Sequence, residues 1–246
     1  MDYIQHQVEV APPSPSAASR FYLPHHAVKK GRHTDVKWRI VFDAYFPEPG
    51  SPSLNDFLEM GPNPLPEILS VLLRFRLHKC AILGDVSQAF LQITLDPKDR
   101  DLTRFLWYRL AQNGQGSYDI TDDVITYRFT RRPFGLTCSP SLFSATIRTL
   151  ANMYHDTYPT ASGFMDRSTY MDDFATSALD ITTIFSVVTS LLNTIRLSMY
   201  KWATNSTHLE DTWRTQVLPL QTVTQLFGMG WDTQSDTLHV DHIETT

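Results

Sequence analysis

Apolar residues recur at helical or alternating spacing along most of the chain, and these patterns predict short strands and helices. Apolar and basic residues partly alternate over residues 36–43, as they would in a half-buried strand. Pro66 is expected to open a helix, because proline is well tolerated at the first helical position. Ser139-Pro140 gives the same signal with an N-cap in front, and Asp180 is expected to cap a helix with a broad apolar stripe, formed by Ile181, Ile184, Phe185, Val188, Leu191, Leu192 and Ile195.

From residue 80 onward the predicted order is strand, helix, hairpin, helix, strand. Residues 80–84 supply the first strand, residues 168–171 and 174–178 form the hairpin, and residues 198–203 supply the last strand. This is the split β-α-β order of a ferredoxin-like antiparallel sheet. The predicted fold class is therefore α+β.

Composition sets broad limits on this fold. The chain has 246 residues, of which 42% are hydrophobic, so it is long enough to bury a core. It has no apolar run of membrane-spanning length and no apolar signal near the N-terminus, so we expect an intracellular, cytoplasmic protein. Residues 1–20 are expected to be a flexible leader, since residues 8–18 are rich in Pro, Ser and Ala. Cys80 and Cys138 are too few for a disulfide framework or a zinc site.

The formal net charge of −5 argues against a protein that binds nucleic acid through bulk positive charge. The basic residues are nevertheless concentrated in three parts of the sequence: Arg20, Lys29, Lys30, Arg32, Lys37 and Arg39; Arg74, Arg76 and Lys79; and Arg128, Arg131 and Arg132. Such clusters form either solvated faces or a groove that faces phosphates. The motifs below favour the groove.

The most informative motif is Tyr170-Met171-Asp172-Asp173, which places two carboxylates in or beside the turn of the predicted hairpin. Asp85 ends another apolar run, at residues 81–85. Carboxylates at neighbouring strand ends are what two Mg²⁺ ions about 4 Å apart need for nucleotidyl transfer. A second pair, Asp122-Asp123, follows a polar stretch and is expected to lie in a solvated loop.

Phe90 follows Asp85 by five residues. An aromatic ring there could close the floor of a nucleotide pocket and exclude a ribose 2′-hydroxyl, which would select deoxynucleotides. The alternative is that Phe90 is an ordinary core residue, since Leu91 and Ile93 are close by in the sequence.

Several short motifs in one order resemble the motif series of reverse transcriptases. They are Lys37-Trp38-Arg39-Ile40-Val41-Phe42-Asp43-Ala44, Ser53-Leu54-Asn55-Asp56, Gly84-Asp85-Val86-Ser87-Gln88-Ala89-Phe90, Arg132-Pro133-Phe134-Gly135-Leu136, Ser139-Pro140, Tyr170-Met171-Asp172-Asp173, Lys201-Trp202 and Leu226-Phe227-Gly228. Residues 22–28, 42–44 and 104–107 resemble, more narrowly, the Bel/Pao group of LTR retrotransposons. The resemblance runs from about residue 21 to residue 240.

This resemblance implies roles for individual residues. Two Mg²⁺ ions, with Mn²⁺ as a substitute, would be held by Asp85, Asp172 and Asp173. The incoming nucleotide would be contacted by Lys30, Arg39, Phe90, Phe134, Gly135 and Lys201, and the primer and template by Tyr170, Met171, Phe227 and Gly228. Lys29 could exchange roles with Lys30, Lys201 could equally be a surface lysine, and residues 226–231 could equally be a turn with a buried Trp231. His25 and His26 are expected to be structural.

The resemblance also implies an architecture of polymerase fingers and palm, with the thumb largely missing. The fingers would comprise residues 21–79 and 96–138 and the palm residues 80–95 and 139–220. Residues 221–246 would form a primer-grip-like hairpin and the start of the thumb. The expected function is an RNA-directed DNA polymerase core of a retrotransposon polyprotein. Its expected partners are an RNA or DNA template with a primer, dNTP, and protease, ribonuclease H and integrase domains, with no membrane.

Two other functions remain open on the sequence. One is a catalytically inactive, vestigial or domesticated fragment that binds nucleic acid, because a fold can outlive its chemistry. The other, more remote, is an RNA-templated RNA polymerase, which Phe90 opposes. A virus-like particle or the nucleus is an alternative location.

Overall fold

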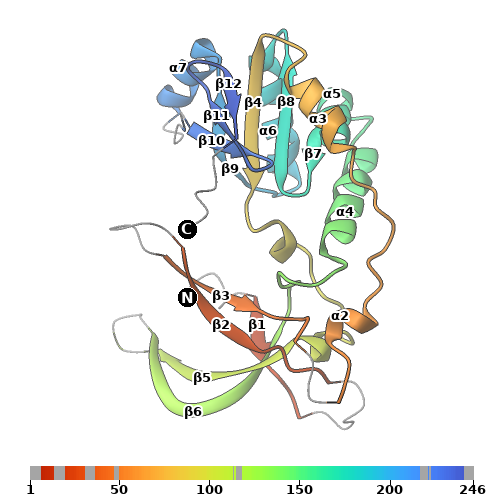
Figure 1. Ribbon diagram of the computed structural model, residues 1–246, viewed down its shortest axis with the longest axis vertical. Coiled ribbons are helices and arrows are strands. Elements are labelled where there is room, and N and C mark those ends of the chain that lie inside the picture. Colours follow the sequence, from red (N-terminus) through yellow and green to blue (C-terminus); the bar gives the residue numbers. More distant parts are fainter. Residues whose placement is uncertain are drawn as a thin grey trace. The chain divides into compact units, whose positions relative to one another are not determined.

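The computed structural model describes residues 7–13, 20–30, 37–46, 50–112, 114, 118–216, 221 and 223–240 (Figure 1). These residues form two compact units. The first unit contains residues up to Gly61 together with Phe90–Ser139, and the second contains Pro62–Ala89 and the residues from Pro140 onward. Among the described residues, no helix has both the length and the apolar character needed to cross a membrane.

The first unit contains two antiparallel sheets. One has the order β1-β6-β5, with β1 at Val8–Val10, β6 at Tyr118–Phe129 and β5 at Arg104–Gln112. The other pairs β2, His25–Lys30, with β3, Lys37–Phe42. The short helix α2, Leu54–Phe57, and the 3₁₀ turns Ala89–Gln92 and Arg100–Thr103 complete the regular structure near this unit.

An apolar core joins the sheets of the first unit. The ring of Phe42 lies 4.9 Å from those of both Phe105 and Phe129, in edge-to-face contacts that aromatic pairs prefer. The buried members of this core are Leu23, Phe42, Ala44, Leu54, Leu91, Phe105, Phe129 and Leu136. The strand predicted from the alternating pattern at residues 36–43 is therefore β3, and its last residue anchors it to this core.

Asp122 and Asp123 correct one expectation. Both lie inside β6 rather than in a loop, and both are exposed. Asp123 forms an ion pair with Arg109 of β5 at 3.7 Å. Aspartate is disfavoured in strands, but on a solvated face its charge stays hydrated, so the ladder tolerates the pair.

The second unit is built on a four-stranded antiparallel sheet with the order β7-β8-β4-β9. These strands are Thr169–Tyr170, Asp173–Ala178, Cys80–Val86 and Met199–Thr204. Since β7 and β8 form a hairpin and β4 pairs with both β8 and β9, this is the predicted split β-α-β arrangement.

Five helices belong wholly or mainly to this unit: α3, Ile68–Phe75; α4, Ser139–Met153; α5, Pro159–Ser168; α6, Ile181–Thr194; and α7, Thr207–Thr215. Asp180 caps α6 as predicted, because its side chain accepts a hydrogen bond from the Thr183 N–H. Helix α5 was not expected from the sequence. It begins with Pro159 at the first helical turn and carries only a weak apolar stripe.

Both faces of this sheet are covered. On one face, Leu83 and Ala175 belong to a core with Val71, Phe75, Leu226 and Trp231. On the other, Trp202 packs edge-to-face against Phe185 of α6, with ring centroids 5.2 Å apart. The first of these cores includes a small sheet, β10-β11-β12, formed by Val223–Leu226, Met229–Asp232 and Thr237–His239.

Candidate functional site

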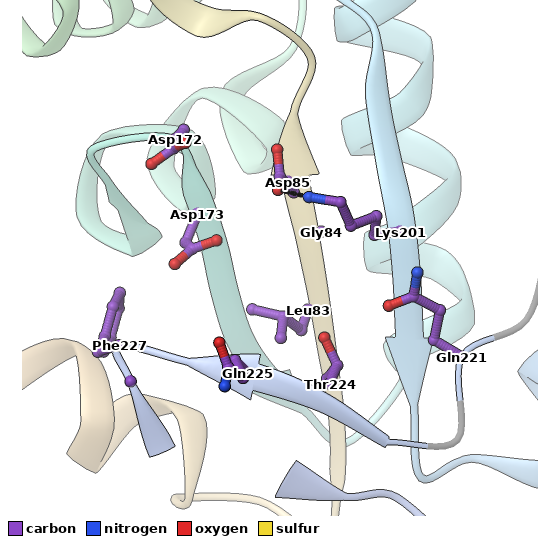
Figure 2. A pocket seen from close by; sticks show the side chains of 11 residues that line it. Leu83, Gly84, Asp85, Asp172, Asp173, Lys201, Gln221, Thr224, Gln225 and Phe227 are labelled. Carbon is purple, nitrogen blue, oxygen red and sulfur yellow. Dashed lines mark hydrogen bonds and ion pairs between the residues drawn. The ribbon is translucent and has the colours of Figure 1, made fainter. Parts of the chain in front are cut away.

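A cavity of about 400 Å³ lies beside β4 and β8, the two inner strands of the four-stranded sheet (Figure 2). It is lined by residues from β4, the β7-β8 turn, the start of β8, β9, the β10-β11 hairpin and the segment before β10. These residues are Leu83, Gly84, Asp85, Asp172, Asp173, Lys201, Gln221, Thr224, Gln225, Phe227 and Gly228. The three acidic residues singled out from the sequence therefore line one cavity.

The strand pairing brings these acidic residues together. Asp85 of β4 and Asp173 of β8 are direct partners in the antiparallel ladder, so their Cβ atoms lie on the same face of the sheet. Asp172 lies in the turn between β7 and β8, and its carbonyl accepts a hydrogen bond from the Val86 N–H at 2.7 Å. That bond ties the turn to β4. Met171, the other turn residue, has a left-handed backbone with φ of 53°.

Lys201 reaches this group from the third strand. The β4-β9 register is irregular between Leu83 and Asp85, and Lys201 has φ of 52° within β9. A bulge of this kind re-aims a side chain. The Lys201 ammonium donates a hydrogen bond to Asp85 Oδ2 and forms an ion pair with it (Figure 2). More than half of the Lys201 side chain, 57%, remains exposed, so the ammonium is also open to a ligand.

The crowding of carboxylates changes their acidity. Burial raises the pKa of Asp172, and the charge of Asp85 adds to this effect while Lys201 opposes it. Burial raises the pKa of Asp173 to about 7, with further contributions from Asp172 and Asp85. These carboxyl groups resist ionisation because they are largely buried and lie near other carboxylates. A cation placed among them would remove that penalty.

The donor set fits a hard divalent cation, since carboxylate oxygens are the ligands that Mg²⁺ prefers. In the described residues, however, no group of three or more His, Cys, Asp or Glu side chains stands ready to hold an ion. Figure 2 shows the reason: the Asp172 carboxylate is turned away from Asp85, and Asp85 is engaged by Lys201. Binding would require these rotamers to change and Lys201 to release Asp85.

The β10-β11 hairpin forms another wall of the cavity. Its turn residues Phe227 and Gly228 have φ of 51° and 83°, and two successive left-handed residues are typical of a type I′ hairpin turn. The Phe227 ring lies edge-to-face on Tyr170, with centroids 5.0 Å apart. The hairpin tip therefore contacts the residue that begins the acidic motif. Trp231 of β11 is fully buried, as expected for a turn with a buried tryptophan. Contact of this hairpin with a primer stays a prediction.

The β2-β3 hairpin of the first unit carries the basic residues expected to contact a nucleotide. Arg39 is exposed and lies opposite Val28 in the ladder, whereas Lys29 lies opposite Trp38. Since neighbouring residues of a strand point to opposite faces, Lys29 and Arg39 lie on different faces of the hairpin. The backbone of Lys30 pairs with that of Lys37, and the side chains of both fall outside what the structure describes.

Phe90 and Phe134 lie together in the first unit, with ring centroids 5.2 Å apart. Phe90 is 8% exposed and Phe134 is 48% exposed. The ring of Phe134 is therefore accessible to a ligand, and it packs against the buried ring of Phe90. Gly135 follows with φ of 92°, and a Cβ atom there would meet the Phe42 carbonyl oxygen at 2.8 Å. Only glycine fits that position without strain.

Several site residues were not identified from the sequence. Gln221, Thr224 and Gln225 line the cavity, but isolated polar residues near a strand carry no distinctive sequence signal. Asn55 is 6% exposed. Its amide donates to the Gly135 carbonyl at 2.8 Å and its side-chain oxygen accepts from the Thr137 N–H at 3.0 Å. The sequence marks Asn55 only as part of a motif, whereas its two hydrogen bonds hold the loop at Gly135–Thr137 in place.

His25 has the structural role expected of it. Its ring lies 5.3 Å from that of Phe42 and 4.9 Å from that of Trp107. Burial lowers its pKa, which favours the neutral imidazole of a residue packed among aromatics.

Comparison with known proteins identifies the family. Residues 46–210, more than half of the chain, match the family model described as reverse transcriptase (RNA-dependent DNA polymerase). No curated protein matches the sequence.

Solved structures of the foamy viral protease-reverse transcriptase are similar to this chain. One complex with double-stranded DNA has a TM-score of 0.60 at 17% identity, covering 98% of this chain and 33% of the viral chain. A second complex with double-stranded DNA has a TM-score of 0.59 at 18% identity, covering 97% of this chain and 39% of the viral chain. The complex with an RNA/DNA hybrid has a TM-score of 0.56 at 15% identity, covering 97% of this chain and 25% of the viral chain. This chain thus spans two fifths or less of the foamy viral chains. The likeness confirms the α+β fold of reverse transcriptase fingers and palm, and together with the family match it shows that the chain belongs to the reverse transcriptase family.

Proposed function

We propose that this chain is an RNA-directed DNA polymerase core that adds dNTP to a primer 3′-hydroxyl with two Mg²⁺ ions. The observation that carries the proposal is that three acidic residues, from β4, from the β7-β8 turn and from β8, line one cavity together with Lys201. The raised pKa values of Asp172 and Asp173 support it, since burial and, to a smaller extent, neighbouring carboxylates disfavour their ionised forms, as is common at functional sites.

In this proposal Asp85, Asp172 and Asp173 hold the metal ions. When bound, the ions would lower the pKa of the primer hydroxyl and neutralise the triphosphate. With the ions bound, Asp85 would no longer need Lys201 as its partner, and the exposed Lys201 ammonium would be available to the phosphates of the leaving pyrophosphate. The turn that carries Asp172 keeps its position through the bond to the Val86 N–H.

The nucleotide contacts of the first unit rest on the resemblance. Arg39 would bond the triphosphate through its planar guanidinium. Lys29 lies on the other face from Arg39, which disfavours Lys29 for a contact made jointly with Arg39. Lys30 is proposed for that contact on the resemblance. Phe134 and Gly135 would lie against the nucleotide, with Phe90 beneath them as the sugar gate. In the second unit, the Phe227-Gly228 turn, Tyr170 and Met171 would hold the primer and template.

Further parts of the proposal follow from the same resemblance. The chain would be one portion of a Bel/Pao-like retrotransposon polyprotein, accompanied by protease, ribonuclease H and integrase domains. We also propose an intracellular location and the division into fingers, palm and primer-grip-like hairpin given under "Sequence analysis".

Primer extension tests the proposal directly. The purified chain is incubated with an RNA template, a DNA primer, dNTPs and Mg²⁺, and Asp172→Asn serves as the inactive control. We expect incorporation by the parent and none by the variant. Equal products from both proteins would exclude catalysis at this cavity.

Phe90→Ala tests the sugar gate. We expect the variant to incorporate ribonucleotides at a higher rate relative to deoxynucleotides, because the space beneath the sugar opens. The ratio of the two kcat/KM values is the measurement. An unchanged ratio would assign Phe90 to the core alone.

A second candidate, a nucleic-acid-binding fragment without catalysis, is favoured by one observation: Lys201 engages Asp85, and the carboxylates stand apart as they are placed. It predicts salt-sensitive binding to a primer-template without incorporation. If Lys201→Ala enables or raises primer extension, the Lys201–Asp85 ion pair is an inhibitory contact in an enzyme. Incorporation of dNTP by the parent chain would exclude the candidate without catalysis.

A further inference from the structure

Trp38 is exposed to an extent that its residue type rarely shows. Its relative exposure is 66%, whereas Trp202, Trp213 and Trp231 are 5% exposed or less. Trp107, the fifth tryptophan, packs against the core of the first unit. Since burial of a tryptophan removes a large apolar area from water, an open indole at the end of a strand marks a contact surface.

The position of Trp38 within the hairpin explains this exposure. On its face of β3, Phe42 is in the core and Ile40 packs partly against it, so burial decreases along the strand toward Trp38. The indole lies beyond the last residue that the core can cover. Strand β3 thus extends beyond the core and has a tryptophan, not a polar residue, at the exposed position 38.

The surroundings of Trp38 are cationic. Lys29 is exposed and lies directly opposite it in the ladder, so the two Cβ atoms are about 5 Å apart. The chain neighbour Arg39 is also exposed, on the other face. The sequences of strands β2 and β3 contain four basic residues and no acidic one, and the segment that joins the strands contains Arg32 and Asp35. A flat aromatic surface beside lysine is complementary to a base joined to its phosphate.

We propose that Trp38 and Lys29 form a binding site for single-stranded nucleic acid, in which one base stacks on the indole and the adjoining phosphate pairs with Lys29. Stacking on aromatic side chains is available to every base, whatever its sequence, whereas the stacked bases of a duplex interior cannot reach the indole. In the proposed polymerase this strand is the unpaired part of the template, a step that rests on the proposed function. The stacking site itself does not require catalysis.

The geometry separates this site from the proposed triphosphate contact. Arg39 and Trp38 lie on opposite faces of one two-stranded hairpin, because they are successive residues of β3. Arg39 would serve a nucleotide on one face while Trp38 serves the single strand on the other. Substitution of Trp38 should therefore affect single-strand binding more than the KM for dNTP.

Intrinsic fluorescence provides a selective measurement, since Trp38 is the tryptophan that solvent and ligands reach most readily. The full chain is titrated with an oligothymidylate and, separately, with a blunt duplex of equal length. We expect the single strand to quench the emission, and we expect Trp38→Phe to abolish the quenching while retaining most of the affinity, measured by anisotropy of a labelled oligonucleotide.

Affinity measurements on further variants complete the test. Trp38→Ala should bind the single strand about 5- to 140-fold more weakly, because stacking of one base contributes roughly 1–3 kcal/mol and 1.4 kcal/mol corresponds to a factor of ten. Lys29→Gln should reduce the slope of log K against log salt by about 0.7, the loss of one phosphate contact to a single strand. Phe57→Ala is the matched control, since Phe57 is 70% exposed on helix α2 and should leave affinity unchanged.

Three results would overturn the inference: unchanged affinity of Trp38→Ala, equal weakening by Phe57→Ala, or equal quenching by the blunt duplex. Thermal unfolding of each variant checks that it is folded, which the exposure of Trp38 favours. Asp85→Asn separates the two proposals. If it binds and is quenched like the parent while the parent extends no primer, the proposed function fails and the stacking site stands. If the parent extends primers but Trp38→Ala binds normally, only the stacking site fails.

Discussion

Gly84 lies one residue before Asp85, and replacing it with alanine is the perturbation whose consequence the structure defines most closely. An alanine Cβ would lie 2.7 Å and 2.8 Å from two atoms of the six-membered ring of Trp202. Carbon atoms in ordinary contact are about 3.5–4.0 Å apart. Trp202 is 5% exposed, and its ring is held at 5.2 Å by Phe185 and at 6.3 Å by Trp213. The indole has no open space to enter, so β4 must move instead.

Overpacking of this kind costs about 1–3 kcal/mol. For a chain of this length, each kcal/mol lowers Tm by roughly 2–4 °C, so Gly84→Ala should lower Tm by about 2–12 °C. Polymerase activity, where present, should fall further than stability, because a displaced β4 carries Asp85 with it. Urea denaturation gives the free energy of unfolding, and primer extension gives the activity.

Two further variants make the reasoning refutable. Gly163→Ala is the control, since a Cβ there meets no atom within 4 Å, and in a helix this change should stabilise by about 0.5–1 kcal/mol. Trp202→Phe removes part of the ring that obstructs Gly84, so the double variant should lose less stability than the two single variants together. If Gly84→Ala is as stable as the parent, or if its cost is the same in the Trp202→Phe background, the close approach of Gly84 to Trp202 is not what excludes a side chain.

The remaining predictions concern charge and hydrogen bonding. The pKa of Asp173 is raised to about 7, so without metal the stability of the parent should fall as pH rises from about 4 to 7, since the unfolded carboxyl loses its proton first. Asp173→Asn should reduce this fall, leaving the part due to Asp172, and should be roughly 1–4 kcal/mol more stable than the parent at pH 8. Parallel curves of stability against pH for the two proteins would contradict the prediction. Asn55→Ala should lower the free energy of unfolding, measured by urea denaturation, by about 2–5 kcal/mol, because the Gly135 carbonyl and the Thr137 N–H lose their partner. The control Asn152→Ala, at an exposed position of α4, should change it by less than about 0.5 kcal/mol. Equal effects of the two variants would show that Asn55 does not hold this loop. Asp101→Asn should lower the free energy of unfolding by about 3–5 kcal/mol, since it leaves the Arg104 guanidinium, whose side chain is 5% exposed, without a carboxylate partner. A loss below about 1 kcal/mol would show that water or Glu9 takes the place of the Asp101 carboxylate.

Much of the fold followed from local sequence patterns. The helix capped by Asp180 and the strands around Asp85 and Asp172 were predictable, because their caps and apolar positions all indicate the same element. The strand at Asp122-Asp123 was missed, because a polar, charged segment reads as a loop unless its long-range pairing with β5 is known. Helix α5 was missed for a similar reason, since its stability comes from packing rather than from a strong apolar stripe.

The candidate site was predictable in its residue types but not in its arrangement. The acidic residues were identified by their place at the ends of apolar runs. The contact of Lys201 with Asp85 depends on a strand irregularity and on a left-handed residue that no local pattern marks. The clamp formed by Asn55 joins residues 80 positions apart, and such pairings arise only from the tertiary fold.

Met171, Lys201 and Phe227 share a left-handed backbone although none of them is glycine, and all three lie in or beside the motif turn, the cavity wall or the hairpin tip. Each such conformation costs about 1–2 kcal/mol relative to one that the residue prefers. A laboratory selection for heat tolerance alone would therefore favour glycine at these positions, relaxing the cavity rim while leaving the carboxylates intact. Variants selected only for thermal stability would therefore be expected to gain it first at residues of the candidate site, where substitution is most costly to activity.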